Sequence, residues 1–433
     1  MADRTRTALL AGLGACLLAV VAAIQSLGDL LTHNDRYLVL YGVALAVCGA
    51  AAVLLWRRAR RLDVAIVLTV ALVARALIAF DAPSLSDDAY RFVWDGRVQA
   101  EGINPYAYAP ADGRLHDLRD FPVFTRVNRP YTRTGYPPAN EVLFFAVNRV
   151  AGEGIGRVKL ALLALEALAV ALLLALLGRT GRSHGRVALY AWHPLAIVEV
   201  ASSAHLEPLV LAAVLASLLA WDRGHALRAG AALGAGVLTK FVPILIAPFM
   251  LRRLGARFAA AAAFTCVALF APYAGAGTDA LGSVGAYGNE RFGAGPFRWL
   301  TEAGVGAGPA RALLLAALVA GVALSAWRPP TDLVGACRYT ALLLAGSMLA
   351  SNQVQPWYLL WVLPLLCVVP IPGLAWAAAT APLLYLTFGP HKLVSQTLAS
   401  VIIWAPTVLL LAGGALRGRP ARPGLPVAAR APT

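Results

Sequence analysis

Residues Ser84–Tyr106 read SLSDDAYRFVWDGRVQAEGINPY and lie near the start of the longest polar segment of the chain, residues 81–137. That segment holds eight of the 22 acidic residues and nine of the 37 Phe, Trp and Tyr residues. Carboxylates beside aromatic rings suit sugar chemistry, because a carboxylate can accept a hydroxyl proton while a flat ring covers the apolar face of a sugar. The simpler interpretation is a solvated loop whose charges keep it in water.

The remainder of the chain is strongly apolar. Apolar residues make up 59% of the sequence, charged residues only 14%, and the mean hydropathy is +0.69. Soluble proteins carry roughly a quarter charged residues. Repeated apolar runs of about 17 to 22 residues each reach across a hydrocarbon core of ~30 Å. We therefore expect an all-α polytopic membrane protein in a lipid bilayer, with about 12 transmembrane helices.

The net charge of +15 reflects topology rather than nucleic-acid binding. Basic residues gather in short loops and tails beside apolar runs, where the positive-inside rule places Lys and Arg on the cytoplasmic side. This pattern predicts a multi-pass protein of the inner (cytoplasmic) membrane, with the polar segment on the outer face. The basic clusters are Arg4 and Arg6, Arg57–Arg61, Arg179–Arg186, Arg223–Arg228, Arg252–Arg257 and Arg417–Arg430.

The same pattern predicts four regions. N-terminal transmembrane helices occupy residues 1–80, and an acidic, aromatic-rich outer loop with interfacial helices occupies residues 81–157. A transmembrane bundle follows at residues 158–414, and a basic, disordered cytoplasmic tail at 415–433. Within the bundle we expect an outer loop at 274–310, continuous spans at 357–369 and 374–388, and a broken helix pair near 229–251, where two prolines interrupt an apolar run that has basic loops at both ends.

The cysteines predict neither a disulfide framework nor a zinc site. All five lie in or beside apolar runs, and the sequence contains no CxxC or Cys/His spacing. We expect no metal and no cofactor.

The outer loop carries the first group of candidate residues. Adjacent residues on a helix point about 100° apart, so Asp87 and Asp88 would seldom face one cavity together, and one of them can cap the helix that follows. The further candidates for substrate binding in this loop are Tyr90, Arg91, Trp94, Asp95, Asn104, Tyr106 and Tyr136.

Polar residues at other outer or intramembrane positions form the second group. Lys240 lies within the broken run, where it can hold a phosphate or snorkel to the surface. Trp357 and Tyr358 can bind substrate or belong to an interfacial aromatic belt. His205 and Glu207 begin a helix on the outer side, and orientation of substrate suits them better than metal binding. The group is completed by Arg291, Arg298 and Gln355.

Several blocks resemble one known family. DDAYRFVWDGRVQAEGINPY and TGYPPANEVLF, followed by HLEPLVLAAVL, LTKFVPILIAPFML, ERFGAGPFRWL and NQVQPWYLLWVLPLL, resemble the GT-C polyprenol-phosphate-sugar-dependent glycosyltransferases. They look most like the bacterial polyprenol-phosphomannose-dependent mannosyltransferases. In many relatives the acidic loop follows the first span, whereas here it follows the third. We therefore expect the first two spans to be an N-terminal addition.

The resemblance implies a GT-C-like bundle whose outer-face loops form the active site. Such an enzyme moves one sugar, which the resemblance implies to be mannose, from a polyprenyl phosphate to a hydroxyl of a glycan or glycolipid acceptor. An Asp general base acts in a single inverting displacement, and a cation (Lys240 and Arg291 or Arg298) stabilises the leaving phosphate. Alternatives are a transporter or flippase of a lipid-linked sugar, and an O-antigen-ligase-like transferase that uses a lipid pyrophosphate.

The base is either Asp87 or Asp88. The family pattern favours an acid just before the aromatic residue without saying which of the two. We favour Asp88, because on a helix it shares the side of Arg91 and Asp95, whereas Asp87 points about 100° away.

Overall fold

The protein is described from a computed structural model that covers residues 3–281, 290–389 and 392–417. Within these ranges, eight helices are long and apolar enough to cross a membrane, or up to nine if one bent pair forms a single span. The expected polytopic helical class is therefore confirmed, and the number of about 12 crossings stays a prediction. The eight are α1 (Asp3–Ser26), α2 (Asn34–Leu55), α3 (Arg61–Ala79), α7 (Ile155–Arg179), α13 (Ala256–Phe270) with its extension η5 (Ala271–Leu281), α16 (Ala307–Trp327), α17 (Leu333–Ala350) and α20 (Gln396–Arg417).

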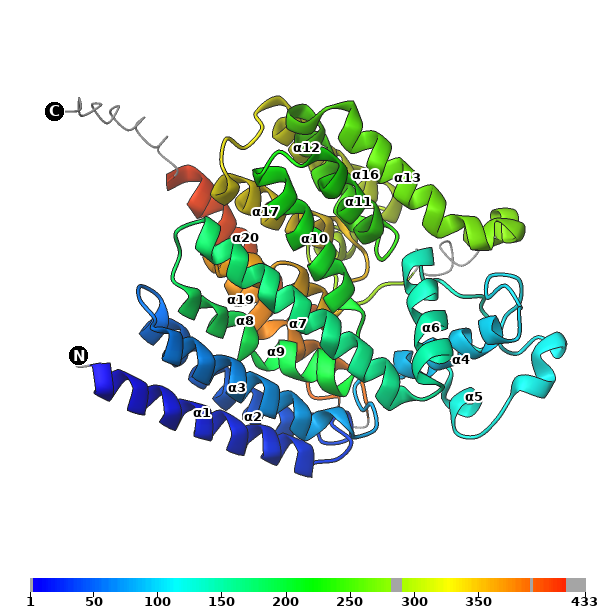
Figure 1. Ribbon diagram of the computed structural model, residues 1–433, viewed down its shortest axis with the longest axis horizontal. Coiled ribbons are helices and arrows are strands. Elements are labelled where there is room, and N and C mark those ends of the chain that lie inside the picture. The colour runs from blue at the N-terminus through cyan, green and yellow to red at the C-terminus, as the bar shows by residue number, and fades with distance from the viewer. Residues whose placement is uncertain (1–2, 282–289, 390–391, 418–433) are drawn as a thin grey trace.

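The first three helices form one side of the bundle. Helix α1 packs against α2 and α3, and α3 packs against α7 and the segment that follows it. In Figure 1 these four helices run across the picture, with the N-terminus on the left and the polar segment on the right. The basic residues that precede α3 and the acidic residues that follow it therefore lie at opposite ends of the bundle.

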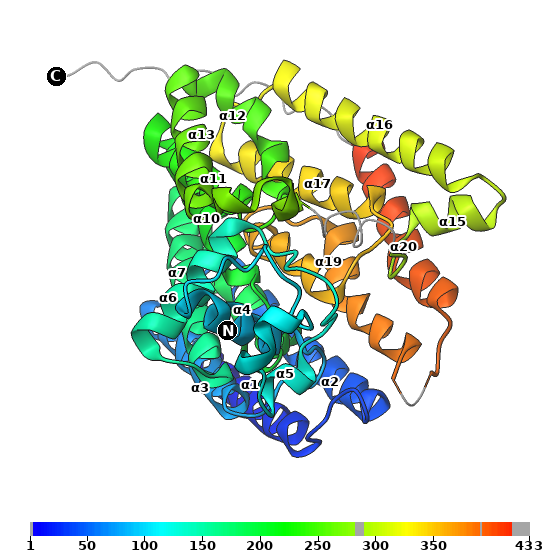
Figure 2. The same cartoon turned by 90° about the vertical axis from the view of Figure 1, so that its right-hand side faces the viewer.

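The polar segment folds as a small helical subdomain, residues 84–151, at the right-hand end of Figure 1. Figure 2 views the protein from that end. Its core stacks Phe92 on Phe144, with ring centroids 4.7 Å apart, and buries Trp94. The apolar faces of its helices therefore pack on one another and hold the polar segment as an ordered unit. Its helices are α4 (Asp88–Ala100), η1 (Gly113–Leu118), α5 (Val123–Arg126) and α6 (Pro138–Ala151).

A sharp bend follows α7 and the short turns η2 (His184–Val187) and α8 (Ala188–Ala191). Helix α9 (Pro194–Ala196) continues into the π-helical turn η3 (Ile197–Ser202), which meets α10 (Glu207–Asp222) at an angle of 120°. Ala204 in the bend is buried and has φ of 61°, a conformation that costs a residue with a Cβ atom free energy. Irregular backbone of this kind is tolerated at membrane depth where protein surrounds it.

The next apolar run is also interrupted. Helix α11 (Ala226–Val237) ends before the turn η4 (Val242–Ile246), and α12 (Ala247–Leu254) completes the run. Gly230 and Gly234 of α11 face α13 so closely that a Cβ atom at either glycine would lie 2.2 Å from the Phe258 carbonyl oxygen or 2.6 Å from that of Ala262. This GxxxG spacing lets two helix backbones approach where side chains would keep them apart.

Residues 356–387 form short helices in place of the two continuous spans that hydropathy suggested. Each helix begins at or beside a proline, whose missing N–H suits a helix start and breaks a helix interior. The prolines therefore divide an apolar stretch that is mostly buried inside the bundle. The helices are η6 (Pro356–Trp361), α18 (Leu363–Leu366), α19 (Pro372–Thr380) and η7 (Ala381–Thr387).

Residues 290–293 meet residues 352–354 through backbone pairing. Phe292 N donates to Asn352 O at 3.1 Å, and Val354 N donates to Phe292 O at 2.7 Å. Helix α15 (Pro296–Glu302) follows directly. Residues 282–289 of the predicted loop 274–310, and residues 418–433 of the predicted tail, lie outside the described residues.

Candidate active site

A cavity of about 500 Å³ lies where the polar subdomain meets the bundle. We call it the Asp88 cavity. Three parts of the chain that are distant in sequence form its walls: the subdomain, the segment after α11, and the end of α17 with the residues that follow. Its lining residues are Asp88, Asn128, Arg129, Gly135–Pro137, Thr239–Val242, Ser347, Met348, Ser351–Gln353, Gln355, Trp357, Tyr358 and Trp361.

The two adjacent aspartates have different surroundings. Asp88 begins α4 and lines the cavity, where the side-chain amide of Asn128 donates a hydrogen bond to its Oδ1. Asp87 is exposed outside the cavity, and its Oδ1 lies 3.0 Å from a guanidinium nitrogen of Arg126. A carboxylate offers about four lone-pair sites. The single hydrogen bond from Asn128 therefore leaves Asp88 able to accept a substrate proton. The expected divergence of the two side chains therefore places only Asp88 at the cavity.

Lys240 lies in the break between α11 and η4 and reaches the same cavity. Its Nζ forms an ion pair with the buried carboxylate of Glu207 at the start of α10. The Nζ also lies 4.4 Å from the ring centroid of Tyr358 and 5.0 Å from that of Trp361. The ammonium group is therefore held by one carboxylate and two aromatic faces, and a lysine has three N–H donors to share with a ligand.

Trp357, Tyr358 and Trp361 form one side of the cavity, which we call the aromatic wall. His205 packs against this wall without lining the cavity. Its ring stacks on Trp357 with centroids 3.7 Å apart, and its Nδ1 lies 3.1 Å from Glu199 Oε2. The Tyr385 hydroxyl donates to Glu199 Oε1 at 2.8 Å. The strained bend at Ala204 aims the histidine at Trp357, so His205 acts on the cavity through that ring.

Two buried carboxyl groups stabilise the wall on the subdomain side. Arg91 Nε donates to Asp95 at 2.9 Å, and the Thr134 hydroxyl donates to Glu141 Oε1 at 2.7 Å. Burial raises the pKa of Asp95. Burial also raises the pKa of Glu141 strongly, and the nearby charge of Asp95 raises it further. Thr134 precedes the cavity-lining residues 135–137, so this network fixes one wall rather than contacting a ligand.

Sequence reasoning missed Arg129, as it missed Asn128 and Trp361 of the same cavity. Arg129 lines the cavity, has φ of 53°, and forms an ion pair with Glu290 in the segment before α15. Gln353, in the segment between α17 and η6, donates to Glu290 at 2.8 Å. Because Arg129 lies in an irregular segment after α5, directly before Pro130, neither helical periodicity nor a motif identifies it.

The other predicted site residues divide between the cavity and its surroundings. Tyr136, Lys240, Gln355, Trp357 and Tyr358 line it with Asp88. Tyr90, Arg91, Trp94, Asp95 and Tyr106 are buried inside the subdomain, and the Asn104 amide donates to Tyr273 O at 3.2 Å. Arg298 bonds Gln396 and Glu302 away from the cavity, and Arg291 is exposed beside Phe297.

No group of three or more His, Cys, Asp and Glu residues able to hold a metal ion occurs in the described part of the chain. His205 and Glu207 accordingly have protein partners of their own, Trp357 and Lys240.

These features define a multi-pass helical membrane protein with a cavity of charged and aromatic residues at one end of its bundle. The sequence matches the family model of the MptA_B family over residues 5–255, which is more than half of the chain. This family model is described as alpha-(1->6)-mannopyranosyltransferase, N-terminal domain. The protein belongs to this family and is therefore a glycosyltransferase of the mannosyltransferase type. No curated protein sequence and no solved structure gave a significant match.

The matched range has two further consequences. It begins before α2 and includes the whole of α1 except its first residues, so the first two spans belong to the family's domain rather than being an addition to it. It ends after α12, so it includes Asp88 and Lys240, whereas the aromatic wall at 355–361 lies outside it. Membership of an enzyme family favours a transferase over the transporter alternative.

Proposed function

We propose that the protein transfers one mannosyl residue from a polyprenyl-phosphate donor to a hydroxyl group of a glycan or glycolipid acceptor. The family description supports mannose as the sugar and α-(1→6) as the linkage. The observation that carries the proposal is that a carboxylate, an ammonium group and three aromatic rings line one cavity: Asp88, Lys240, Trp357, Tyr358 and Trp361.

Asp88 acts as the general base in this proposal. Its carboxylate accepts the proton of the acceptor hydroxyl, whose oxygen forms the new bond to the anomeric carbon. The bond between that carbon and the phosphate oxygen breaks, and the polyprenyl phosphate leaves with the electron pair. A single displacement inverts the anomeric centre, so an α-linked product requires a β-linked donor.

The leaving phosphate needs positive charge more than it needs a proton, because it is already an anion. Lys240 and Arg129 are the two cations that line the cavity in the described chain. Each is paired with a carboxylate, Glu207 or Glu290, and so is held in place before a ligand arrives. The donor phosphate would share the lysine's remaining N–H donors and sit over the Tyr358 edge of the cavity.

The aromatic wall suits the sugar. Trp357 is stacked on His205, and Tyr358 is stacked on Trp361 with ring centroids 4.5 Å apart. Rings held in stacks lose little side-chain entropy when a ligand binds, and their faces cover the apolar C–H surface of a pyranose.

The reaction is assigned to the outer face of the inner membrane. The Arg-rich loop at 57–61 precedes α3, and the Asp88 cavity lies beyond the other end of that helix. The positive-inside rule then puts the cavity outside, where a lipid-linked sugar rather than a nucleotide sugar is the donor to expect.

The test uses the full-length protein reconstituted in proteoliposomes with a glycolipid acceptor. Three radiolabelled donors are compared: β-linked polyprenyl-phosphate mannose, polyprenyl-pyrophosphate mannose and a nucleoside-diphosphate mannose. We expect transfer from the first alone, with a product sensitive to an α-mannosidase. Transfer from the nucleotide sugar in its place would overturn the proposal, and transfer from the pyrophosphate would support the ligase-like alternative.

A further inference from the structure

A second cavity, of about 740 Å³, lies at the end of the bundle opposite the Asp88 cavity. We call it the arginine cavity. It is formed where three parts of the chain meet: the start of α1, the loop between α2 and α3, and the loop after α7. Its lining residues are Asp3, Arg6, Arg57–Arg60, Gly181, Arg182, Ser183 and His184.

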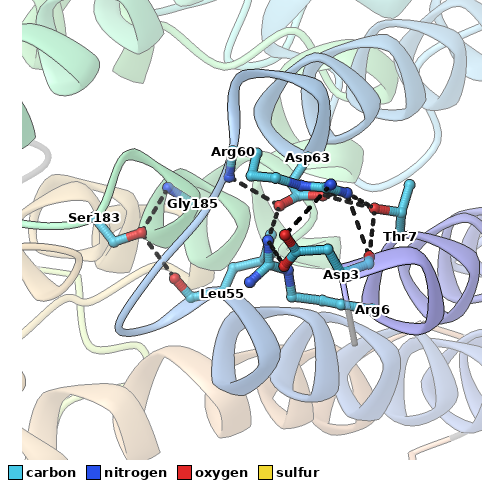
Figure 3. A network of polar contacts seen from close by, with 8 residues as sticks. All are labelled: Asp3, Arg6, Thr7, Leu55, Arg60, Asp63, Ser183 and Gly185. Atoms are coloured by element: carbon cyan, nitrogen blue, oxygen red, sulfur yellow. Dashed lines mark hydrogen bonds and ion pairs between the residues drawn. The ribbon is translucent and has the colours of Figure 1, made fainter. Parts of the chain in front are cut away.

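A buried aspartate fixes two of the arginines in this cavity (Figure 3). Asp63, in the first turn of α3, is fully buried and accepts a hydrogen bond from Arg60 N at 2.8 Å. Arg6 Nη2 lies 3.0 Å and Arg60 Nη2 3.6 Å from its carboxylate oxygens. Thr7 donates to the same carboxylate at 3.1 Å, so one acid anchors α1 and the α2–α3 loop together.

The loop after α7 closes the cavity tightly. Ser183 Oγ donates to Leu55 O at 2.9 Å and accepts from Gly185 N at 3.3 Å (Figure 3). A Cβ atom at Gly185 would lie 2.6 Å from Ala59 Cβ and 2.7 Å from Leu55 Cβ, so only glycine allows this approach. Close packing and hydrogen bonds therefore hold the three parts of the chain around the cavity in fixed positions.

The cavity keeps an excess of positive charge. Among the described residues, its five arginines face the carboxylates of Asp3 and Asp63 alone, which leaves a net charge of +3 with His184 neutral. Arg57 and Arg58 are exposed and form no ion pair with the described residues. The Nε atoms of Arg6, Arg60 and Arg182 are buried without a hydrogen-bond partner in the described chain.

We propose that the arginine cavity binds the phosphate head group of an anionic phospholipid. Arginine is a frequent protein partner of phosphate, because its planar guanidinium can donate two parallel N–H hydrogen bonds to the phosphate oxygens. The cavity lies at the ends of spanning helices α1, α2, α3 and α7, the depth at which lipid phosphates lie. Trp56, an interfacial residue type, stands beside it with the Arg186 guanidinium 4.2 Å from its ring centroid.

A membrane lipid fits this position better than a soluble anion. Leu9 lies about one helical turn after Arg6 in α1 and is 50% exposed, and Val53, in α2, lies about one turn before Arg57 and is 78% exposed, so apolar surface continues from the arginines along both helices. A phospholipid can fill both, with its acyl chains on this surface and its phosphate in the cavity. A bound lipid would hold α1 against the α2–α3 loop, and so stabilise the N-terminal side of the bundle.

The test uses the full-length protein, purified and delipidated in detergent. It is titrated with phosphatidylglycerol or with phosphatidylcholine of the same acyl chains, and native mass spectrometry counts the bound lipids. The double variant Arg57→Ala/Arg58→Ala removes two exposed charges from the cavity. The matched control Arg223→Ala/Arg228→Ala removes two exposed charges, one from the loop after α10 and one from the first turn of α11, which the Arg179–Asp222 ion pair places at the same end of the bundle.

We expect the wild type to bind phosphatidylglycerol in preference to phosphatidylcholine. The cavity variant should lose affinity for phosphatidylglycerol by roughly 25-fold, because it lacks two arginines and each arginine near a membrane surface contributes about a factor of five. The control should keep the wild-type affinity. Equal affinity in the cavity variant and the wild type would overturn the proposal.

Two further arms complete the test. An excess of inorganic phosphate should leave the bound phosphatidylglycerol in place, and its complete displacement would identify a soluble-anion site instead. The elution volume and the thermal midpoint of each variant in phosphatidylcholine nanodiscs check folding. If the double variant does not fold, Arg182→Ala takes its place, since its Nε has no partner to lose.

Discussion

Arg75 of α3 and Glu166 of α7 form a buried ion pair, with Nε of the arginine 2.6 Å from Oε2 of the glutamate. Arg75 Nη1 also donates to Ala191 O at 2.9 Å, and the Tyr190 hydroxyl donates to Glu166 at 3.1 Å. Charges inside a membrane bundle are costly unless they are paired and hydrogen-bonded. This cluster therefore joins the first three helices to the part of the bundle that carries the bend at Ala204.

Breaking that pair on one side should destabilise the fold. Arg75→Ala leaves the Glu166 carboxylate buried without its partner, which costs about 3–5 kcal/mol. The double variant Arg75→Met/Glu166→Leu replaces both charges with apolar groups of similar size, and should lose much less. Unfolding of the purified variants in detergent, followed by tryptophan fluorescence, measures both. A double variant as unstable as the single one would contradict the assignment.

The buried Glu141 in the polar subdomain predicts a pH dependence. Its pKa in the folded protein is raised above the unfolded value by burial and by Asp95. The folded state therefore binds more protons than the unfolded state at pH values between the two pKa values, and stability falls as pH rises through that window. At low pH, below the unfolded pKa, the group contributes no penalty.

Glu141→Gln should remove this penalty. The amide keeps an acceptor for Gln99 Nε2, which now donates to Glu141 at 2.9 Å, and it cannot ionise. We expect the difference between the thermal midpoints of the variant and the wild type to increase from pH 4 to pH 8, because the ionisation of Glu141 destabilises only the wild type. Glu101→Gln, at an exposed position after α4, is the control. Parallel pH profiles for Glu141→Gln and the wild type would count against it.

The sequence predicted the helical class, but it predicted the continuity of the apolar runs only in part. Apolar runs identify α1, α2, α3 and α7, because a helix that spans lipid must be apolar over its whole length. Residues 356–387 show the limit of this signal. They are as apolar as a span, but prolines break them into short helices, and burial within protein makes the breaks tolerable.

The residues that line the Asp88 cavity show a similar limit of prediction from sequence. Lys240 and Asp88 were identifiable because a charge in an apolar run, or an acid in a family motif, is unusual by itself. Arg129 was not, since an arginine in an irregular loop has no distinguishing pattern. Its place depends on the pairing of residues 290–293 with 352–354, a contact between loops that no periodicity encodes.

Membrane orientation can be tested with single cysteines at exposed positions of the two ends. Asp117→Cys in the polar subdomain should react with an impermeant thiol reagent in intact cells. His184→Cys at the arginine cavity should react only after the membrane is opened. The wild type, with five native cysteines, sets the background. The opposite pattern would place the Asp88 cavity in the cytoplasm.

Lys240 should be required for donor binding. Lys240→Met alone leaves Glu207 buried and unpaired, so the informative variant is Lys240→Met/Glu207→Leu, which removes both charges. A charge-assisted contact with a phosphate is worth roughly 1.5–3 kcal/mol, so donor affinity should fall about ten- to hundredfold. Arg298→Met, a cation outside the cavity, is the matched control. Direct binding of labelled donor measures both, and unchanged affinity in the double variant would exclude this role.

The two neighbouring aspartates give the sharpest test of the mechanism. Asp88→Asn keeps the shape of the side chain but cannot accept a proton, whereas Asp87→Asn changes a carboxylate that pairs with Arg126 outside the cavity. Loss of a general base commonly costs about 10²–10⁴ in rate, so Asp88→Asn should lose turnover on that scale while it keeps donor binding. Asp87→Asn should retain most activity, because an exposed ion pair contributes little to stability. Initial rates and donor affinity are measured on the same preparations, which separates a chemical defect from a binding defect. If Asp87→Asn were the inactive variant, the base would be Asp87, and if both variants kept full activity, neither carboxylate could be the base.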